Sequence, residues 1–430
     1  MTSENKSSGA TFAQHKPDVE TTGTGLKRWL LSKLVHHIGY PPIRIVLWDG
    51  TSWVDHAHQT IATVYIKNKT WLTRLILNPD LYFGEAYMAG DIEVEGDLES
   101  ALQAVYKSRT AHANSTPAEQ LTYAWRSWRR NNSMAGSRRN IHRHYDIGND
   151  FYKLWLDREA MQYTCAYYES PEDSLEQAQL NKLEHVCRKL QLKPGQTVVE
   201  AGCGWGGLAR YMARHYQVRV KAYNISEEQV KFAREKVREE SLDHLVEYVL
   251  DDYRNINGDF DAFVSVGMLE HVGKENYPAL GSIMRRALKP DGLGLIHSIG
   301  RNYPAPMNAW IDKRIFPNAY PPSISEIMPI FEPNGLSILD IENLRQHYTQ
   351  TLRDWLQRYE EHLPEIRKHF DEPFVRAWRL YLAGSAASFA GGYLQLFQIV
   401  FTHGENNNLS RTRKHLYMDA SDEKGFHGSI

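Results

Sequence analysis

The stretch Glu200-Ala201-Gly202-Cys203-Gly204-Trp205-Gly206-Gly207 decides the fold of this chain. It overlaps the end of the β-branched run Thr197–Ala201 and leads into Leu208–His215, which has a helical pattern. A glycine-rich turn between a strand and a helix is typical of a nucleotide site, because glycine lets the backbone turn sharply and approach a ligand closely. We therefore expect this turn to hold a nucleotide-like cofactor.

From Thr197 onward, short β-branched runs alternate with helical stretches, as in the βαβ units of a parallel sheet. The expected strands are Thr197–Ala201, Val218–Tyr223, Val246–Leu250, Phe260–Val266, Gly294–Ser298, Leu336–Ile341 and Leu394–Phe401. The expected helices are Leu208–His215, Glu227–Glu239, Tyr277–Ala287 and a longer section around Thr351–Ala390. Lys289-Pro290-Asp291-Gly292 predicts a turn before the fifth strand, because Pro presets one dihedral angle and Gly supplies a positive one. The pattern predicts an α/β fold with a seven-stranded, Rossmann-like sheet.

Polar groups follow three of these strands in a row. Glu200 precedes the glycines and can accept a hydrogen bond from a cationic or amino-bearing ligand. Asn224-Ile225-Ser226-Glu227-Glu228-Gln229 ends the second strand, where a ribose contact is expected, and Asp251-Asp252-Tyr253 ends the third, where a purine ring is expected. No Gly-Lys-Ser/Thr follows the turn, which argues against a P-loop, whereas the glycines alone leave NAD as an alternative.

Composition and charge narrow the class of protein. The chain has 430 residues, 42% of them hydrophobic, which is enough for a large core with one main and one appended domain. The formal net charge of -2 gives no whole-chain attraction to polyanions, so we expect no nucleic-acid partner. Cys165, Cys187 and Cys203 have no metal-ligand spacing, so we expect no metal site and a reducing cytoplasm.

Shifts in composition suggest the domain boundaries. Residues 26–118 contain the strand-like runs Arg44–Leu47 and Ile61–Lys67 and a mixed apolar pattern through Leu72–Tyr106. The polar N-terminal stretch has no apolar core of a signal peptide and is expected to be disordered. We predict a disordered tail at 1–25, a small N-terminal domain at 26–118, a basic linker at 119–145, a catalytic domain at 146–405 and a C-terminal tail at 406–430.

Two segments bear on membranes. Gln120–Tyr145 has no Asp or Glu but carries six arginines with Trp125 and Trp128 between them. Such a segment suits anionic lipid headgroups, and a solvated linker whose arginines pair with carboxylates elsewhere is an equal alternative. Leu380–Gly404 has no charged side chain but is too polar to span a bilayer, and its part Tyr393–Phe401 is expected to be a buried strand.

Six short sequence motifs, one of them the glycine-rich turn, resemble those of one family, the cyclopropane-fatty-acyl-phospholipid synthases. This family is related to the mycolic-acid cyclopropane synthases. The resemblance covers about Tyr82 to Phe401. The strings are Gly84-Glu-Ala-Tyr-Met-Ala-Gly90, His144-Tyr-Asp-Ile-Gly-Asn-Asp150, Met161-Gln-Tyr-Thr-Cys-Ala-Tyr167, Gly202-Cys-Gly-Trp-Gly-Gly207, Ser265-Val-Gly-Met-Leu-Glu-His-Val-Gly273 and Trp310-Ile-Asp-Lys-Arg-Ile-Phe-Pro317. The resemblance implies the fold of class I methyltransferases and S-adenosylmethionine as the cofactor.

The resemblance also implies a cofactor site. It carries cofactor binding to Tyr163, Thr164, Gly202, Gly204, Trp205, Gly206, Gly207, Asn224, Ile225, Ser226, Gln229, Asp252 and Tyr253, in addition to Glu200. Two positions depart from the family, since Glu200 stands where Asp is more frequent and Asn224 where Thr is common. Both residues keep the ability to form hydrogen bonds and change the length of the contact.

The implied reaction transfers the sulfonium methyl to a cis double bond of a phospholipid acyl chain and closes a ring by proton loss. Because an alkene is a poor nucleophile, the site must hold it against the methyl group and exclude water. It must also supply negative charge near the developing cation and a base for the final proton. The family base is a bound bicarbonate, and its matching positions here are Cys165, Glu270, His297, the backbone of Ile299, and Tyr348. Taken singly, Cys165 also suits a small apolar core residue and His297 a core histidine.

The partners implied are membrane phospholipids with unsaturated acyl chains, reached from the cytoplasmic inner face of the membrane, and a second copy in a homodimer. By analogy alone, the N-terminal domain presents lipid or pairs subunits. The alternatives are a lipid methyltransferase making methyl-branched or methylene products, a catalytically silent binding protein, and a small-molecule O- or N-methyltransferase. The last would not need the basic, Trp-bearing segment Trp125–Arg143.

Overall fold

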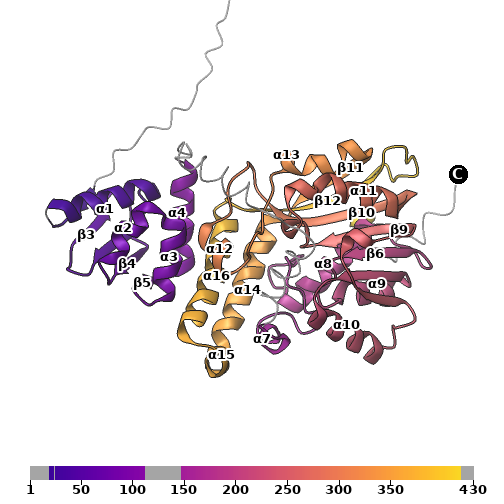
Figure 1. Ribbon diagram of the computed structural model, residues 1–430, viewed down its shortest axis with the longest axis horizontal. Helices are drawn as coiled ribbons and strands as arrows, with labels where there is room; N and C mark the ends of the chain where they lie inside the picture. The colour runs from indigo at the N-terminus through magenta and orange to yellow at the C-terminus, as the bar shows by residue number, and fades with distance from the viewer. Residues whose placement is uncertain (1–18, 24, 112–146, 418–430) are drawn as a thin grey trace, which may run out of the picture.

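The computed structural model of the chain describes residues 19–23, 25–111 and 147–417. The basic segment Gln120–Tyr145, and with it the predicted linker, lies outside the described residues. Figure 1 shows a small N-terminal unit, a central group of helices and a large sheet with its own helices, arranged side by side.

The large sheet has seven strands in the order β11-β12-β10-β9-β6-β7-β8. β12 runs antiparallel to both of its neighbours, whereas β10, β9, β6, β7 and β8 pair in parallel. This confirms the predicted α/β fold with a seven-stranded, Rossmann-like sheet. The strands are β6 Thr197–Ala201, β7 Arg219–Asn224, β8 Val246–Leu250, β9 Phe260–Val266, β10 Leu288–Gly300, β11 Leu336–Asn343 and β12 Gln395–His403.

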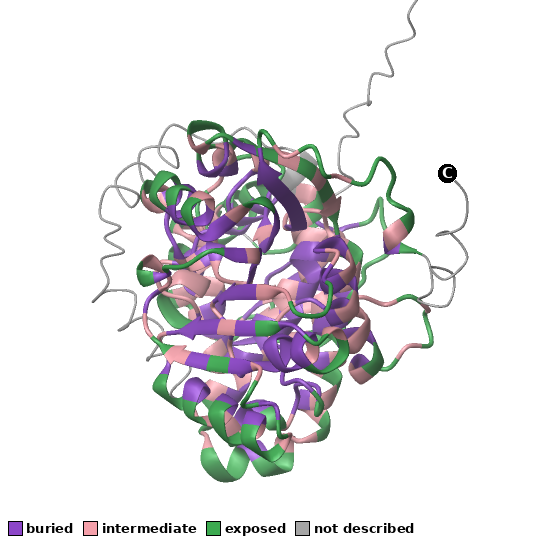
Figure 2. Cartoon of the chain, turned by 90° about the vertical axis from the view of Figure 1, so that its right-hand side faces the viewer, coloured by how far each residue is buried: buried purple, intermediate pink, exposed green. Residues whose placement is uncertain are grey.

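Alternating apolar residues let the sheet bury both faces. On β6, Val198 packs into the cluster formed with α8 (Leu175–Lys189), α9 (Gly207–Tyr216) and α10 (Glu227–Glu239). Val199 packs into the opposite cluster, formed with α11 (Tyr277–Ala287). Figure 2 shows the buried strands in purple between helices with exposed outer surfaces. Chain order reverses between β6 and β9, so the carboxyl ends of these strands frame the place where such sheets bind ligands.

Two predicted elements were wrong in extent. The turn Lys289–Gly292 lies inside β10, where the pairing with β9 shifts register between Leu288 and Leu293. The turn-forming residues thus produce a bulge within β10 and do not end the strand, because Leu288 before them and Leu293 after them both pair with β9. The helical section Thr351–Ala390 is three helices, since Pro364 and Pro373 stand in the first turns of the second and third. They are α14 Arg345–Glu361, α15 Leu363–His369 and α16 Glu372–Ala390.

The N-terminal unit contains a five-stranded sheet in the order β1-β3-β2-β4-β5. The predicted runs Arg44–Leu47 and Ile61–Lys67 correspond to β2 and β4. β1 uses residues of the predicted disordered tail, because it pairs with β3. The strands are β1 Val19–Thr21, β2 Arg44–Leu47, β3 Ser52–Asp55, β4 Ala62–Ile66 and β5 Ile92–Gly96, and the helices are α1 Gly25–Ile38, α2 Thr70–Leu77, α3 Pro79–Met88 and α4 Leu98–Ala111.

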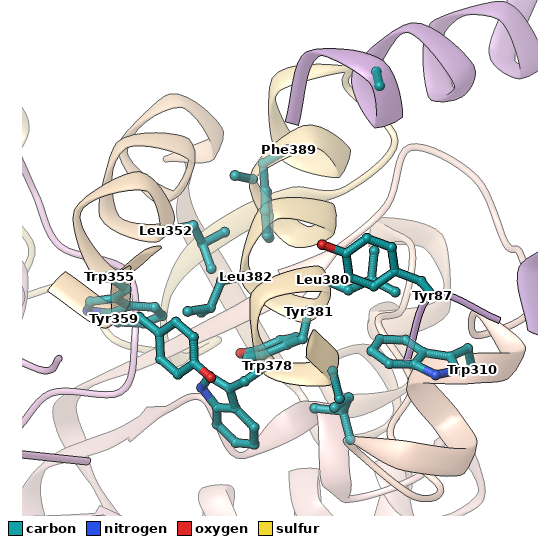
Figure 3. Close-up of a cluster of buried hydrophobic side chains, with 14 of the residues drawn as sticks. Tyr87, Trp310, Leu352, Trp355, Tyr359, Trp378, Leu380, Tyr381, Leu382 and Phe389 are labelled. Atoms are coloured by element: carbon teal, nitrogen blue, oxygen red, sulfur yellow. The ribbon is translucent and has the colours of Figure 1, made fainter. Parts of the chain in front are cut away.

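Two of the sequence strings meet in space where the N-terminal unit contacts the central helices. Gly84 of α3 lies against Trp310 of α12 (Ala309–Arg314), and an added Cβ at Gly84 would come within 2.4 Å of the indole ring. Glu85 accepts two hydrogen bonds of 2.7 Å from Arg314. Figure 3 shows Tyr87 and Trp310 beside residues of α16. The contact therefore depends on a glycine, a bidentate ion pair and buried aromatic side chains.

The uncharged segment Leu380–Gly404 divides as the sequence indicates. Its first part belongs to α16, and all nine residues of β12 in its second part are buried. Among the described residues, no helix combines the length and the apolar character needed to cross a membrane.

Candidate active site

The glycine-rich turn adopts a conformation that L side chains rarely take. Gly202, Gly204 and Gly206 have φ angles of 84°, 53° and 77°. At Gly206 an added Cβ would also lie 2.4 Å from the Tyr248 hydroxyl oxygen, which donates to the Gly206 carbonyl over 2.7 Å. The turn therefore requires glycine at these positions and brings backbone to the end of β6.

Asn224 ties this turn to the end of β7. Its amide nitrogen donates to the Gly204 carbonyl (3.1 Å) and to Gln229 Oε1 (2.9 Å). Its Oδ1 accepts from the backbone nitrogens of Ile225 (2.8 Å) and Ser226 (3.2 Å). Ser226 in turn caps α10. The polar residues after β7 are thus bonded to the glycine-rich turn and to one another. The Asn224 side chain uses both its amide nitrogen and its Oδ1 in these internal hydrogen bonds.

A small cavity lies at the carboxyl ends of β6, β7 and β8. Of the predicted cofactor residues it brings together Gly202, Asn224, Ile225, Asp252 and Tyr253. Several predicted residues lie away from its wall: Glu200, Gly204, Trp205, Gly206, Gly207, Ser226 and Gln229. Trp205, for instance, is buried and donates to Asn149 Oδ1 over 2.8 Å, which is a packing role. The cavity wall also includes Asp251, from the polar string expected near the purine ring, and residues that the sequence did not single out as ligands: Tyr223, Arg254, Met268, His271, Val272, Pro317 and Asn318.

Glu200 lies behind the turn in the core. Burial raises its pKa to about 7, against the opposing effect of the Lys182 and Arg210 charges. Its Oε2 has no hydrogen-bond partner in the described part of the chain. Lys182 is itself buried and donates to Gln162 and to Thr164 Oγ1, and burial lowers its pKa to about 8. The two groups place opposite charges close to the turn in a dry environment.

A second, larger cavity brings together all five of the predicted catalytic residues. Tyr163 and Thr164 line it too, and His271 belongs to the walls of both cavities. Glu270 Oε1 accepts from the Ile299 backbone nitrogen over 2.6 Å, whereas its Oε2 has no partner among the residues that the structure describes. Burial raises the pKa of Glu270 to about 7. The Ile299 amide, predicted to face an anion, is therefore used to orient Glu270.

A chain of hydrogen bonds fixes the imidazole of His297. Lys189 Nζ donates to Gln398 Oε1 (2.7 Å) and to Glu342 Oε2 (2.5 Å). Gln398 therefore presents its amide hydrogens to His297 Nδ1, at 3.0 Å. Burial lowers the pKa of His297 well below its usual value, so the ring is neutral, and Nε2 carries the proton. Within residues 19–23, 25–111 and 147–417, that nitrogen has no hydrogen-bond partner.

The remaining predicted catalytic side chains complete the wall. Cys165 is fully buried, which raises the pKa of its thiol, and its Sγ donates to the Ala166 carbonyl over 3.1 Å. Tyr348 projects from α14 and packs against Phe389 with ring centroids 4.6 Å apart. Tyr163 donates its hydroxyl to Tyr381 over 2.8 Å. The polar cluster is therefore enclosed by thiol and aromatic groups that exclude water.

The larger cavity continues from this cluster into the N-terminal unit. Its far wall consists of aliphatic side chains on α1, β2, β4, β5 and α4. Representative residues are Leu34, Ile45, Val64, Ile92, Leu102 and Val105. The apolar interior of the small sheet and the catalytic cluster thus share one cavity, although they are far apart in sequence.

Some of these functional groups could have been found from the sequence and others could not. His271 directly follows Glu270 in a quoted string, so its neighbour in the sequence could have indicated it. Gln398 is a polar residue within a buried strand, which is also a signal. Its partner Lys189 is 209 positions away, and only the tertiary fold brings them together.

Comparisons with known proteins agree with this geometry. The model of the family described as mycolic acid cyclopropane synthetase matches residues 132–399, and a domain of unknown function matches residues 30–117. The chain is 38% identical to the cyclopropane-fatty-acyl-phospholipid synthase of Escherichia coli K12, over 82% of this chain and 91% of that one. It is 35% identical to a probable fatty acid methyltransferase of Pseudomonas putida, over 87% and 96% of the two chains.

Solved structures show the same fold. The cyclopropane synthase MmaA2 of Mycobacterium tuberculosis superposes with a TM-score of 0.59 at 28% identity, covering 61% of this chain and 97% of that one. A coclaurine N-methyltransferase, at 19% identity and a TM-score of 0.60, covers 74% of this chain and 98% of that one and shares the fold alone. The chain has the sheet of class I methyltransferases and belongs to the mycolic acid cyclopropane synthetase family.

Proposed function

We propose that this chain transfers the methyl group of S-adenosylmethionine to a cis double bond in a phospholipid acyl chain and closes a cyclopropane ring. The observation that carries the proposal is the position of Glu270 and His297. They are buried polar groups in the wall of a mostly apolar cavity, which meets the cavity beside the glycine turn at His271. An oily substrate and a nucleotide-like methyl donor can therefore meet at one point.

The residues of the smaller cavity fit S-adenosylmethionine. Gly202 lets the backbone approach the cofactor closely, and Asp252 and Tyr253 offer polar and aromatic contacts. Asn224 holds the glycine-rich turn in place through its hydrogen bond to the Gly204 carbonyl. When bound, this group supplies an electrophilic methyl. A similar structure, the mycolic acid cyclopropane synthase CmaA1, is complexed with SAH and CTAB at 29% identity, which supports both the cofactor and an apolar ligand.

The larger cavity fits a small oxyanion, which we identify as bicarbonate. His297 offers an Nε2–H donor and Glu270 an Oε2, and neither atom has a partner among the described residues. With a pKa of about 7, Glu270 can hold a proton shared with such an anion near neutral pH. Bicarbonate would supply a base for the last proton, and Tyr348 and Cys165 close its surroundings.

The aromatic wall suits the positive charge that develops on the acyl chain. Phe316 lies between Tyr163 and Tyr381, with ring centroids 6.5 Å and 5.5 Å away. Aromatic faces attract cations, and the attraction is stronger where water is excluded. These side chains would hold the alkene in place and stabilise the cation until the proton leaves.

The test incubates the purified full chain with S-adenosylmethionine and vesicles of an unsaturated phosphatidylglycerol, followed by mass spectrometry of the fatty-acid methyl esters. We expect a product heavier by one CH2 that resists hydrogenation. A chain that makes no lipid product with several headgroups and acyl chains overturns the proposal.

The alternative product is a methyl-branched or methylene acyl chain. It is favoured by the similarity to the probable fatty acid methyltransferase of Pseudomonas putida, which extends over 96% of that relative. The same assay separates the outcomes, since a methylene product is sensitive to hydrogenation and a branched product is saturated without a ring.

We also propose that the N-terminal unit presents lipid, since its aliphatic interior continues the cavity that contains Glu270. Contact with the membrane surface is assigned to α1. Leu26 and Trp29 are 69% and 56% exposed on this helix, and Lys33 lies 5.6 Å from the Trp29 ring centroid. Exposed apolar side chains beside cations suit an anionic bilayer surface. The homodimer and the cytoplasmic location stay predictions.

A further inference from the structure

Arg301 is a buried cation that the proposed reaction does not use. It directly follows β10, is 3% exposed and lines the larger cavity together with Glu270 and His297. Its Nη1 donates to the Pro306 carbonyl over 2.7 Å, and its guanidinium lies 5.1 Å from the Tyr393 ring centroid. No residue in the described part of the chain forms a hydrogen bond with its Nε.

No Asp or Glu in the described part of the chain forms an ion pair with Arg301, which sets it apart from other buried cations. Lys189 has Glu342 and Arg210 has Glu240. Among the described residues, Lys182 has only neutral hydrogen-bond partners, but burial lowers its pKa to about 8, so it can give up its proton. A guanidinium group, in contrast, does not lose its proton in a protein and stays charged. Burying an ion without a counter-ion costs several kcal/mol, so the site is incomplete without an anion.

The position of Arg301 indicates which anion completes it. Ile299 is the penultimate residue of β10 and Arg301 directly follows the last one, Gly300; both line the same cavity, and the Ile299 amide holds Glu270. Tyr393, beneath the guanidinium, stacks on Tyr106 of α4 with centroids 5.5 Å apart. The cation therefore lies near the junction of the catalytic cluster and the N-terminal unit, inside the space assigned to lipid.

We propose that Arg301 binds the anionic head of the lipid substrate, the phosphodiester of a phospholipid, and so sets which carbon atoms of the acyl chain reach Glu270. The inference rests on the proposed function. Guanidinium matches phosphate oxygens in a bidentate manner, and such charge-assisted bonds are among the strong ones. A free fatty acid offers a carboxylate with the same chemistry, and the experiment distinguishes the two sources.

The experiment measures steady-state kinetics in mixed micelles of a neutral detergent with three substrates: dioleoylphosphatidylglycerol, dioleoylglycerol and oleate. Dioleoylglycerol has the acyl chains of the first lipid but no anion. We expect Arg301→Gln to raise KM for dioleoylphosphatidylglycerol about tenfold or more with little change in kcat, because a hydrogen bond to a charged group is lost. Kinetics with dioleoylglycerol stay at the wild-type values, so the preference for the phospholipid disappears.

The control is Arg286→Gln. Arg286 also donates to a backbone carbonyl, that of Ile256 over 3.1 Å, but it does not line the cavity. Its substitution should leave the preference unchanged. Arg301→Lys keeps the charge without the planar fork and should give an intermediate KM, and it replaces Arg301→Gln if that variant does not fold.

The outcomes separate the two proposals. A wild-type enzyme with no turnover on any lipid overturns the proposed function. A wild-type enzyme that treats dioleoylphosphatidylglycerol and dioleoylglycerol alike, or an Arg301→Gln variant that loses activity equally on both, overturns the role of Arg301 and leaves the reaction intact. A loss confined to oleate assigns the site to a carboxylate and overturns the phosphodiester.

Discussion

Glu270 opposes the stability of the fold at the position where the proposed chemistry needs it. Burial raises its pKa from 4.5 to about 7. Between these values the folded chain keeps a proton that the unfolded chain has released, so stability falls as pH rises through this window. A destabilising ionisable group in a cavity wall is typical of a functional site.

This linkage gives the first prediction, for Glu270→Gln. The amide keeps an acceptor for the Ile299 nitrogen and has no charge to bury. At about pH 8 the variant should unfold at a higher temperature than the wild type, by a free energy on the order of 3 kcal/mol, and the difference should vanish near pH 4. Calorimetric melts across this range measure it, with Glu275→Gln, an exposed neighbour, as the unchanged control.

The same variant should lose turnover at least about tenfold, equal to about 1.4 kcal/mol of transition-state stabilisation, while binding S-adenosylhomocysteine as before. A variant that is no more stable at high pH contradicts the raised pKa of Glu270. A variant that is stabilised yet fully active contradicts its catalytic role.

Gln398 is a positioning residue for His297, which yields the second prediction. Gln398→Leu removes the donor to Nδ1, so the neutral imidazole is free to place its proton on either nitrogen. Nitrogen-15 NMR of labelled histidine should show His297 protonated at Nε2 in the wild type and a mixture in the variant. Turnover should fall about tenfold or more with cofactor binding unchanged. An unchanged tautomer with reduced turnover would mean that Gln398 acts only through packing.

The sequence predicted residues that lie at strand ends and missed those that act through tertiary contacts. Glu270 and Asp252 follow strands, so their places in the two cavity walls were predictable. Trp205 donates to Asn149 and lies in the aromatic core, and its contact with the cofactor stays a prediction. Arg301 had no signal, since its missing carboxylate is visible only in the folded chain.

At the scale of elements, strong periodicity and clear boundaries made prediction successful. β6, β8, β9, α10 and α11 have the predicted bounds, because β-branched runs or amphipathic spacing specify them locally. β5 was missed because Ile92-Glu-Val-Glu-Gly96 has only two apolar side chains and is stabilised by pairing with β4. The predicted turn at Lys289–Gly292 does not separate two elements for a related reason. Leu288 and Leu293, on either side of it, both pair with β9, so the strand continues through it.

Helix α1 carries the third prediction. Leu31, Leu34, Val35 and Ile38 face the core, so the exposed Leu26 and Trp29 are available to a bilayer. Leu26→Ser with Trp29→Ser should weaken co-sedimentation with phosphatidylglycerol vesicles by about tenfold or more, since each buried side chain contributes about 1.5–3 kcal/mol.

The matched control for α1 is Ile341→Ser on β11, where the side chain is 40% exposed. It should bind vesicles as the wild type does. Equal binding of the α1 variant and this control would remove α1 as the membrane contact. A contact made through the segment Gln120–Tyr145 would then be the remaining interpretation.

At the scale of the whole molecule, the N-terminal unit and the rest of the chain pack together around one mostly apolar cavity. α3 and α4 pack on α16, and the Glu85–Arg314 pair holds α3 on α12. The cavity crosses this contact, so the N-terminal unit forms part of its wall. Its depth should therefore limit the length of acyl chain that the enzyme accepts, provided that the substrate reaches the small sheet.

Ala101→Phe tests this limit and is the last prediction. Ala101 lies on α4, is 4% exposed and lines the cavity in the N-terminal unit, away from Glu270. A phenyl group there fills space without touching the catalytic cluster, so turnover should fall severalfold with an oleoyl phospholipid and remain near the wild-type rate with a shorter myristoleoyl one. Ala104→Phe is the control, since Ala104 is on the same helix but not in the cavity wall. Equal losses on both lipids, or equal losses in both variants, would show that the acyl chain does not extend into the N-terminal unit.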